Sequence, residues 1–288
     1  MGGTVGADQT TRPATIPPRS RVVTALGWLS LILLVLTVYG AFFAAPVEVV
    51  QGIHQRIFYI HVPIAWIAFL AFFVVFVASA AYLRTRRRSW DRLARASAEV
   101  GVVFTTLVLI TGALWGRPIW GTWWTWDPKL TTTLVLWFIY VGYLMLRTYV
   151  AEPERAARSC AVVGLVGFVD VPIVYFSTTW WRALHPGPMI VRSDGPALPP
   201  GMLWVFFLSL IAFNALYVYL VAQRVRVEQL KEMLLDRLDR LATDGPEHRP
   251  VPAGLTGAGE TWTAPHQATT VPEVAPGPQL REEREGVS

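Results

Sequence analysis

Six long apolar runs constrain this chain more than any other feature. They lie at about 22–45, 57–83, 98–115, 131–150, 159–179 and 201–223. About 20 apolar residues in a helix cross the roughly 30 Å hydrocarbon core of a bilayer, and a soluble core does not need repeated runs of that length. The composition agrees, with 53% hydrophobic and only 16% charged residues. We therefore predict an all-α polytopic membrane protein, built as a six-transmembrane-helix bundle.

The positive charges are sorted between the two sets of connections. One set holds the N-terminal arginines together with Arg84, Arg86, Arg87, Arg88, Arg92, Arg95, Arg155 and Arg158, and the other holds Arg56, Arg117, Lys129, Arg182 and Arg192. Because Lys and Arg are enriched in cytoplasmic loops, both termini are predicted to be cytoplasmic. The same sorting makes nucleic acid an unnecessary explanation for the arginine runs. The first apolar run is too long for a signal peptide and is interpreted as a retained span.

The segments outside the spans differ in composition. Residues 1–21 and 244–288 are rich in Pro, Gly and Thr, which predicts disorder. The six-span domain is predicted at 22–223. Beyond it, apolar residues recur at helical spacing between charges, which predicts a cytoplasmic amphipathic helix at 224–243. These apolar residues are Val225, Val227, Leu230, Leu234, Leu235, Leu238 and Leu241.

A tryptophan-rich loop at 115–129 carries five of the chain's 13 tryptophans. Indole rings gather at the membrane–water boundary, so an aromatic belt is one explanation. If the segment were helical, Trp120, Trp123 or Trp124, and Asp127 would share one face as a flat shelf. Asp127 followed by Pro128 also matches an N-cap and first helical residue. The density of indoles favours a binding surface for a planar apolar ligand.

The run WGTWWTWD (residues 120–127) resembles the WWD signature of the heme-handling proteins of cytochrome c biogenesis, and above all the six-span CcmC family. Two further segments, Tyr59–Pro63 and Trp180–His185, resemble the histidine-bearing segments of that family. The resemblance covers about residues 22–223. It implies that His61 and His185 are axial ligands of heme iron. It further implies that the shelf consists of Trp115, Trp120, Trp123, Trp124, Trp126 and Asp127.

The resemblance also implies a function. A CcmC-like protein would hold heme b transiently and non-covalently on the outer face of the bacterial inner (plasma) membrane, and deliver it to a heme chaperone of the CcmE type. The implied partners are an ABC-type CcmA/CcmB pair, a small CcmD-like subunit and membrane lipid. No enzymatic activity is expected. The single cysteine, Cys160, excludes a CxxC redox pair and a CxxCH heme-attachment site, and no GxxxxGK[ST] motif is present.

Heme propionates require cations or hydrogen-bond donors. The candidates in the outer loops are Arg56, Arg117, Lys129 and Arg182, each of which could instead be an ordinary interfacial charge. Arg117 is preferred, because it lies inside the tryptophan-rich loop and guanidinium binds carboxylates through two parallel hydrogen bonds. Another histidine, His54, matches nothing in the family pattern and is interpreted as a loop residue.

Two other functions remain open on the sequence. A membrane b-type cytochrome passing electrons to quinone would place histidine pairs deep inside facing spans. A proton-coupled transporter would use Asp170, a carboxylate within an apolar run, although a structural role beside Pro172 is favoured. Larger system II heme proteins share the WWD motif, but they have more spans than this chain.

Overall fold

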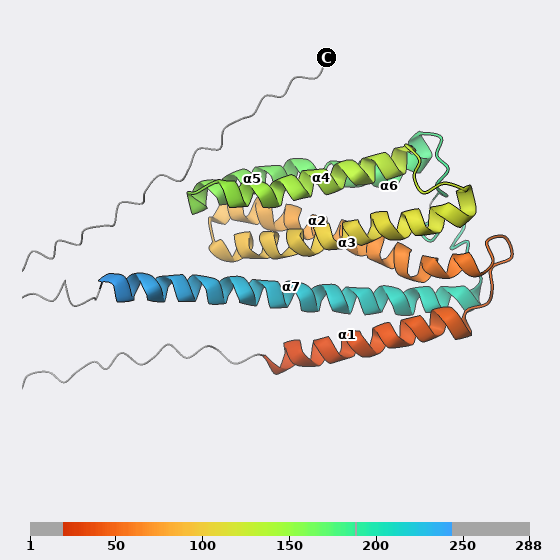
Figure 1. Cartoon of the computed structure of the whole chain (residues 1–288), viewed down its shortest axis with the longest axis horizontal. Helices are drawn as coiled ribbons and strands as arrows, with labels where there is room; N and C mark the ends of the chain where they lie inside the picture. Colours follow the sequence, from red (N-terminus) through yellow and green to blue (C-terminus); the bar gives the residue numbers. More distant parts are fainter. Residues whose placement is uncertain (1–19, 188, 244–288) are drawn as a thin grey trace, which may run out of the picture. The chain divides into compact units, whose positions relative to one another are not determined.

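The computed structural model describes residues 20–187 and 189–243, and within those ranges the regular structure is helical, apart from one isolated bridge between Glu48 and Gly52 (Figure 1). The predictions of disorder fall almost entirely outside these ranges. The helices are α1 (Arg21–Tyr39), η1 (Gly40–Ala44, a π turn), η2 (Ile53–Ile57, 3-10), α2 (Phe58–Thr85), α3 (Arg88–Trp120), α4 (Pro128–Tyr149), α5 (Pro153–Gly167), α6 (Asp170–Trp180) and α7 (Pro200–Thr243).

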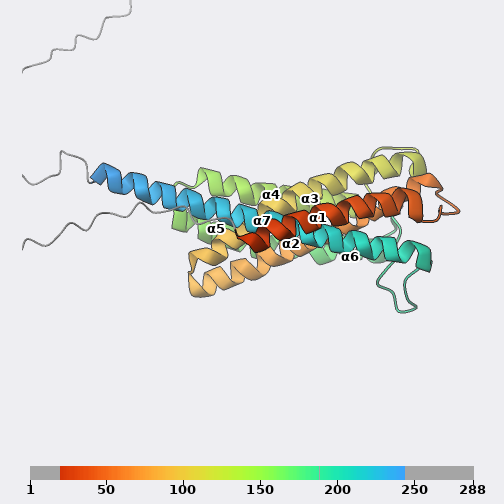
Figure 2. The same cartoon turned by 90° about the horizontal axis from the view of Figure 1, so that it is seen from below.

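The predicted number of spans is confirmed. In the described residues, six helical segments are long and apolar enough to cross a membrane: Arg21–Ala44, Ile53–Thr85, Arg88–Trp120, Pro128–Tyr149, Pro153–Trp180 and Pro200–Ala242. They run alongside one another (Figure 2). The connection that carries the tryptophan-rich loop defines one end of the bundle, called here the tryptophan end. The connection between α2 and α3 defines the opposite end, called the arginine end.

Two helices differ from the predicted spans. The fifth span is interrupted at Phe168 and Val169, where the amides of Val169 and Val171 bond the carbonyl oxygens three residues earlier at 3.1 Å. Pro172 follows this break and has no amide hydrogen to donate. The sixth span continues without interruption into the segment predicted as a separate amphipathic helix, so α7 extends from Pro200 to Thr243.

The chain divides into two compact units, and all six spans have most of their length in the first, Met1–Arg237. Of the second unit, which starts at Leu238, the structure describes the last turns of α7. Within the first unit, α2 packs closely on α3 and on α5, and α4 contacts α3, α5 and α6. The site described below depends only on this first unit.

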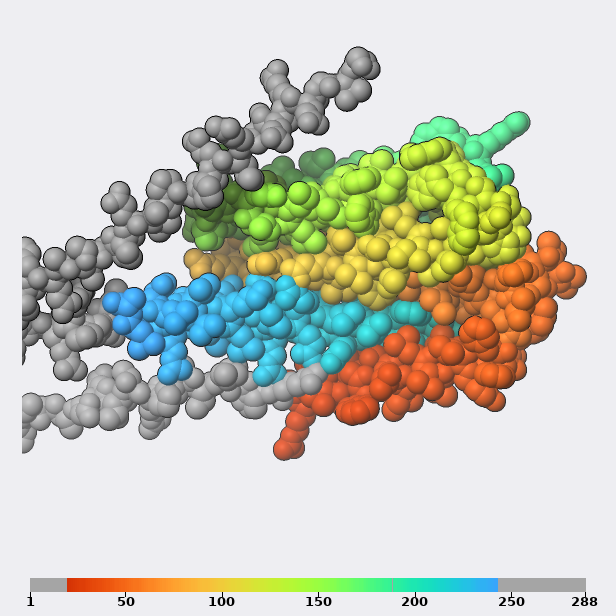
Figure 3. All heavy atoms as spheres, in the orientation of Figure 1, coloured from red at the N-terminus to blue at the C-terminus, as the bar shows by residue number. Residues whose placement is uncertain are grey.

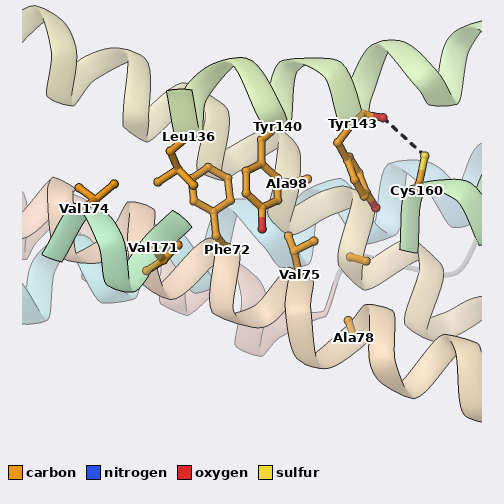
Figure 4. Close-up of a cluster of buried hydrophobic side chains, with 11 residues drawn as sticks. Phe72, Val75, Ala78, Ala98, Leu136, Tyr140, Tyr143, Cys160, Val171 and Val174 are labelled. Carbon is orange, nitrogen blue, oxygen red and sulfur yellow. Dashed lines mark hydrogen bonds between the residues drawn. The ribbon is translucent and has the colours of Figure 1, made fainter. Parts of the chain in front are cut away.

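The main core lies where α2, α4 and α5 meet (Figure 4). Phe72 and Tyr140 stack with ring centroids 3.7 Å apart, and both are fully buried. The thiol of Cys160 donates to the carbonyl oxygen of Tyr143 at 3.5 Å, which makes this residue part of the packing between α5 and α4. Aromatic stacking of this kind fixes α2 and α4 relative to each other. Both helices continue toward the tryptophan end, where they form walls of the cavity described below.

The first and last spans pack together beside this core. In Figure 3, α1 (red) and α7 (blue) lie next to each other on one face. Gly27 permits the close approach, because a Cβ there would come within 2.7 Å of the Tyr219 ring. On its other side α7 reaches α2 and α3, since Ser209 donates to the carbonyl oxygen of Tyr59 and the hydroxyls of Ser97 and Tyr217 lie 2.8 Å apart.

Ionic contacts hold α3 to α7 beyond the apolar part of the bundle. Arg95 bonds Glu228 at 2.7 Å and Glu99 at 3.2 Å, while Arg224 pairs with both carboxylates. Glu228 is buried among these cations. Helix α3 starts ten residues before the predicted span, and α7 continues past the predicted end of its span. In both extensions the charged residues form ion pairs, which stabilise the helices beyond the predicted spans.

A glycine substitution tests the packing of α3 on α2. Replacing Gly101 by alanine is expected to lower stability by about 1–3 kcal/mol, because the new Cβ would lie 2.7 Å from Phe72 Cε1 in a packed core. Thermal unfolding in detergent measures the change. Gly142→Ala in α4 is the matched control, since a Cβ at this helical glycine meets no atom within 4 Å. Equal melting temperatures for the two variants would contradict the packing.

Candidate functional site

A cavity of about 360 Å³ opens inside the tryptophan end of the bundle. Its walls come from α2, α3, α4 and α6, and residues 184–187 and 189–191, called here the covering segment, close it from the tryptophan end. The lining is mostly apolar. It includes a few polar side chains, among which are His61, His185 and Lys129. Ligand sites in proteins are concave, largely apolar and have a few placed polar groups, so this cavity is the candidate site.

His61 lies one turn inside α2 and is 6% exposed. Its Nδ1 is 2.8 Å from Thr111 Oγ1, and that hydroxyl donates to the carbonyl oxygen of Leu107 at 2.6 Å. Because the hydroxyl hydrogen is used on Leu107, we assign the proton of the imidazole to Nδ1. The unprotonated Nε2 is then the nitrogen that can bind a metal.

The backbone around His61 leaves space for this ring. A Cβ at Gly112 would lie 3.2 Å from His61 Cε1, which is tighter than an ordinary contact. Trp115, one turn further along α3, packs edge-on against the imidazole with ring centroids 5.6 Å apart. Its indole nitrogen donates to Gln51 Oε1 at 3.0 Å. Three residues of α3 therefore contact the imidazole of His61.

His185 lies in the segment that covers the cavity. Its Nδ1 is 3.1 Å from the carbonyl oxygen of Pro186, which can only accept, so this imidazole also carries its proton on Nδ1 and leaves Nε2 free. Burial, helped by the positive charge of Lys129, lowers the pKa of His185 to about 4. The imidazole is consequently neutral at physiological pH, as a metal ligand must be.

Asp127 joins the tryptophan-rich loop to the segment that carries His185. Its Oδ1 accepts from the amide of Leu130 at 3.0 Å and caps α4, as predicted. Its Oδ2 accepts from the amides of Leu184 and His185 at 3.1 and 3.2 Å. One buried carboxylate thus fixes the start of α4 and the backbone of a candidate ligand 58 residues away.

The tryptophans do not form the helical face considered above, and that expectation is wrong. Helix α3 ends at Trp120, followed by Gly121 with φ of +76°, and α4 does not begin until Pro128. A residue without a side chain is favoured at such a left-handed position. Because residues 121–127 are not helical, the indoles between the two helices do not share one helix face.

The structure places two of the five indoles at the cavity. Trp115 and Trp120 line it, and the ring of Trp120 lies 6.2 Å from that of His185. Trp123, Trp124 and Trp126 are not among the lining residues. Trp123 and Trp126 are 57% and 75% exposed, and Trp124 packs edge-on against Trp126. The predicted shelf is thus divided between a cavity wall and an exposed surface.

The four cations considered as propionate ligands lie in different places. Lys129 lines the cavity and forms no ion pair with any described residue. Arg117, the preferred candidate, donates to the carbonyl oxygen of Gly121 and lies 5.9 Å from the centroid of Trp123, outside the lining. Arg56 donates to the carbonyl oxygen of Ala41 at 2.6 Å, and Arg182 is exposed.

Two other residues singled out from the sequence lie away from the cavity. His54 is exposed in η2. Asp170 is the first residue of α6, next to the break in the fifth span, and its buried Oδ2 has no hydrogen-bond partner among the described residues. It does not line the cavity.

Comparison with known proteins decides the family. A family model described as CcmC: Heme exporter protein C matches residues 9–238. The chain belongs to the heme exporter protein C family. The heme exporter protein C of Bradyrhizobium diazoefficiens is 39% identical over 219 residues, which are 75% of this chain and 83% of that protein. The heme exporter protein C of Escherichia coli is 34% identical over 224 residues, 76% of this chain and 90% of that protein.

A relative outside bacteria is similar too. A putative cytochrome c biosynthesis ccmC-like mitochondrial protein of Marchantia polymorpha is 34% identical over 178 residues, 62% of this chain and 75% of that protein. Family membership and the six apolar helices together make this heme exporter C member a multi-pass membrane protein.

Sequence reasoning missed the residues that position the histidines in this family member. Thr111 lies 50 residues from His61, and nothing in its local sequence distinguishes it from other span threonines. Gly112, where a Cβ would lie 3.2 Å from the imidazole, was likewise not identified from the sequence. Lys129 was a candidate propionate ligand, but the sequence favoured Arg117, because only its closeness in sequence to the indoles could be used to rank the cations.

Proposed function

We propose that the protein binds heme b reversibly and non-covalently in this cavity, with His61 and His185 as the two axial ligands of the iron. The observation that carries the proposal is that both imidazoles line one cavity, each with its Nδ1 hydrogen bonded and its Nε2 free. Bis-imidazole ligation would hold the iron, and the apolar walls suit a porphyrin.

The geometry suits a cargo more than a permanent cofactor. One ligand, His61, is fixed between two helices, whereas the other, His185, is in a covering segment tied down mainly through Asp127. Release of that segment would free one axial position without moving the helices. We propose that heme leaves in this way to a heme chaperone of the CcmE type, which would approach beside the exposed Trp123 and Trp126.

The arrangement across the membrane follows from the charges. We infer that the arginine end is cytoplasmic, because Arg84, Arg86, Arg87 and Arg88 lie there, and that both termini share this side. The cavity then faces the outer side of the inner membrane. On the family resemblance, the ABC-type CcmA/CcmB pair and a small CcmD-like subunit are the proposed partners, and the names of the relatives support a role in heme delivery for cytochrome c biogenesis.

A heme titration tests the proposal. The full chain in lipid nanodiscs is titrated with ferric heme and followed by absorption spectroscopy. We expect saturation at one heme per protein with a low-spin, six-coordinate spectrum. Absence of saturable binding, or binding of several hemes with a high-spin spectrum, would refute it. A b-type cytochrome in electron transfer is not favoured, because His185 lies in the connection between α6 and α7 and not deep inside a span that faces His61.

Lys129 is expected to bind a heme propionate. We expect Lys129→Gln to weaken heme binding by roughly tenfold, the equivalent of about 1.4 kcal/mol, which is within the range of one hydrogen bond to a charged group. Arg117→Gln is the matched control, because that guanidinium lies outside the cavity lining and should leave affinity nearly unchanged. The reverse ranking in the titration would restore Arg117 as the propionate ligand.

Thr111 is expected to act as a positioning residue for His61. Thr111→Val keeps the shape of the side chain but removes the acceptor for the imidazole Nδ1 hydrogen. Such outer-shell losses typically cost 10–100-fold in metal affinity, so we expect a loss of roughly tenfold. Thr111→Ser should restore both affinity and spectrum. If valine and serine behave alike, the tautomer assignment is wrong.

A further inference from the structure

The wall of the cavity between α2 and α6 is built differently from the others. Close helix packing joins α2 to α3, α3 to α4, and α4 to α6. Helix α2 also packs closely against α5, but not against α6. At the level of the cavity, where α6 has replaced α5, the seam between α2 and α6 is therefore closed by side chains.

One aromatic pair closes this seam at the cavity. Trp66 of α2 and Tyr175 of α6 meet edge to face, with ring centroids 6.3 Å apart. Both line the cavity, and Trp66 is 36% exposed. Trp66 lies five residues after His61, or about 7–8 Å deeper at 1.5 Å per residue. At that depth in an apolar span, the seam between α2 and α6 borders the hydrocarbon of the membrane.

Nearer the arginine end, more aromatic side chains fill the seam. Phe168, at the break between α5 and α6, packs against Phe73 at 5.8 Å and against Phe76 at 4.8 Å between ring centroids. None of these three rings lines the cavity. Among the described residues, one aromatic pair closes the seam beside the cavity, and three aromatic rings close it beside the core.

The element on the far side of the seam is a short helix that a two-residue break joins to α5. Helix α6 runs only from Asp170 to Trp180, and the break at Phe168 and Val169 separates it from α5. At this break the amides of Val169 and Val171 bond carbonyl oxygens three residues earlier, and Pro172 has no amide hydrogen to donate. A tilt of α6 about the break would part Trp66 from Tyr175 while the cluster around Phe168 stays closed.

We propose that the seam between α2 and α6 is a lateral portal, gated by Trp66 and Tyr175, through which a membrane-dissolved tetrapyrrole enters the cavity. This inference rests on the proposed heme site and adds the route and the source. Heme is flat and amphipathic, so its apolar edge lies naturally in hydrocarbon. Entering sideways, it reaches His61 directly and keeps its carboxylates toward Lys129 at the tryptophan end.

Crosslinking the gate tests the portal. In a Cys160→Ala background, Trp66→Cys and Tyr175→Cys are combined, joined with a short bis-maleimide, and the protein is placed in nanodiscs. Heme is supplied either from liposomes that contain it or from a heme–albumin complex in water. We expect the crosslink to slow loading from liposomes at least tenfold, with the final low-spin spectrum unchanged. Trp66→Ala, without a crosslink, should speed the same loading severalfold.

The lower seam provides the matched control. Phe73→Cys with Phe168→Cys, crosslinked in the same way, should leave the loading rate unchanged because these rings lie away from the cavity. Equal rates with and without the Trp66–Tyr175 crosslink, or a slowing confined to heme supplied from water, would overturn the portal. Either result leaves the heme site intact, whereas the absence of a low-spin spectrum in the uncrosslinked protein would refute the site itself.

Discussion

Replacing His61 by alanine is expected to convert bound heme from a low-spin, six-coordinate form to a high-spin form and to weaken binding by roughly 100-fold or more. The estimate is a lower bound, because losing only an outer-shell partner of a metal ligand already costs 10–100-fold. The imidazole is buried and bonded to Thr111, and the neighbouring side chains Ile60, Val62 and Ala65 have no atom that binds iron. Absorption spectra and a heme titration measure both effects.

His185→Ala should produce the same spin change with a smaller loss of affinity. His185 lies in the covering segment, whereas His61 is held by two helices, so the porphyrin would remain seated against α2 and α3. His54→Ala is the control, because this histidine is exposed in η2 and outside the cavity lining. A wild-type spectrum in both cavity variants would show that the ligands are wrongly assigned.

Asp127→Ser is expected to lower heme affinity by roughly tenfold or more while leaving α4 capped. Serine can cap a helix as aspartate does, but its shorter side chain cannot also reach the amides of Leu184 and His185. Hydrogen bonds to charged groups contribute about 1.5–3 kcal/mol each. Losing the two that hold this segment should therefore free His185 and give a mixture of six- and five-coordinate heme in the absorption spectrum.

Asp127→Ala separates the two roles of this carboxylate. It removes the cap as well as the bonds to the covering segment, so it should match the serine variant in heme affinity and fall below it in stability by about 0.5–2 kcal/mol, the cost of a lost N-cap. Thermal unfolding of the heme-free protein measures the difference. If the serine variant binds heme like the wild type, Asp127 is only a helix cap.

The spans could be predicted because their signal is local. Each apolar run carries its own length and composition, and Asp127–Pro128 marks a helix start through chemistry confined to three residues. The break in the fifth span had a local signal too, in Asp170 and Pro172. Its effect was not predicted, because a proline near a helix start is also compatible with an unbroken helix.

The interior of the site could not be predicted, because its contacts join distant parts of the chain. The bond from Thr111 to His61 spans 50 residues, and that from His185 to Asp127 spans 58. The resemblance identified both histidines, but it treated the indoles as one surface. Gly121 ends α3 and separates Trp120 from the exposed indoles, so adjacent residues in WGTWWTWD have different environments.

Electron paramagnetic resonance of the ferric heme-loaded protein, with histidine labelled by ¹⁵N, tests the central claim most directly. If one iron is bound between His61 and His185, the spectrum is low-spin and its hyperfine couplings correspond to two histidine nitrogens, with one coupling lost in each alanine variant. A high-spin spectrum, or a single histidine coupling in the wild-type protein, would contradict the account.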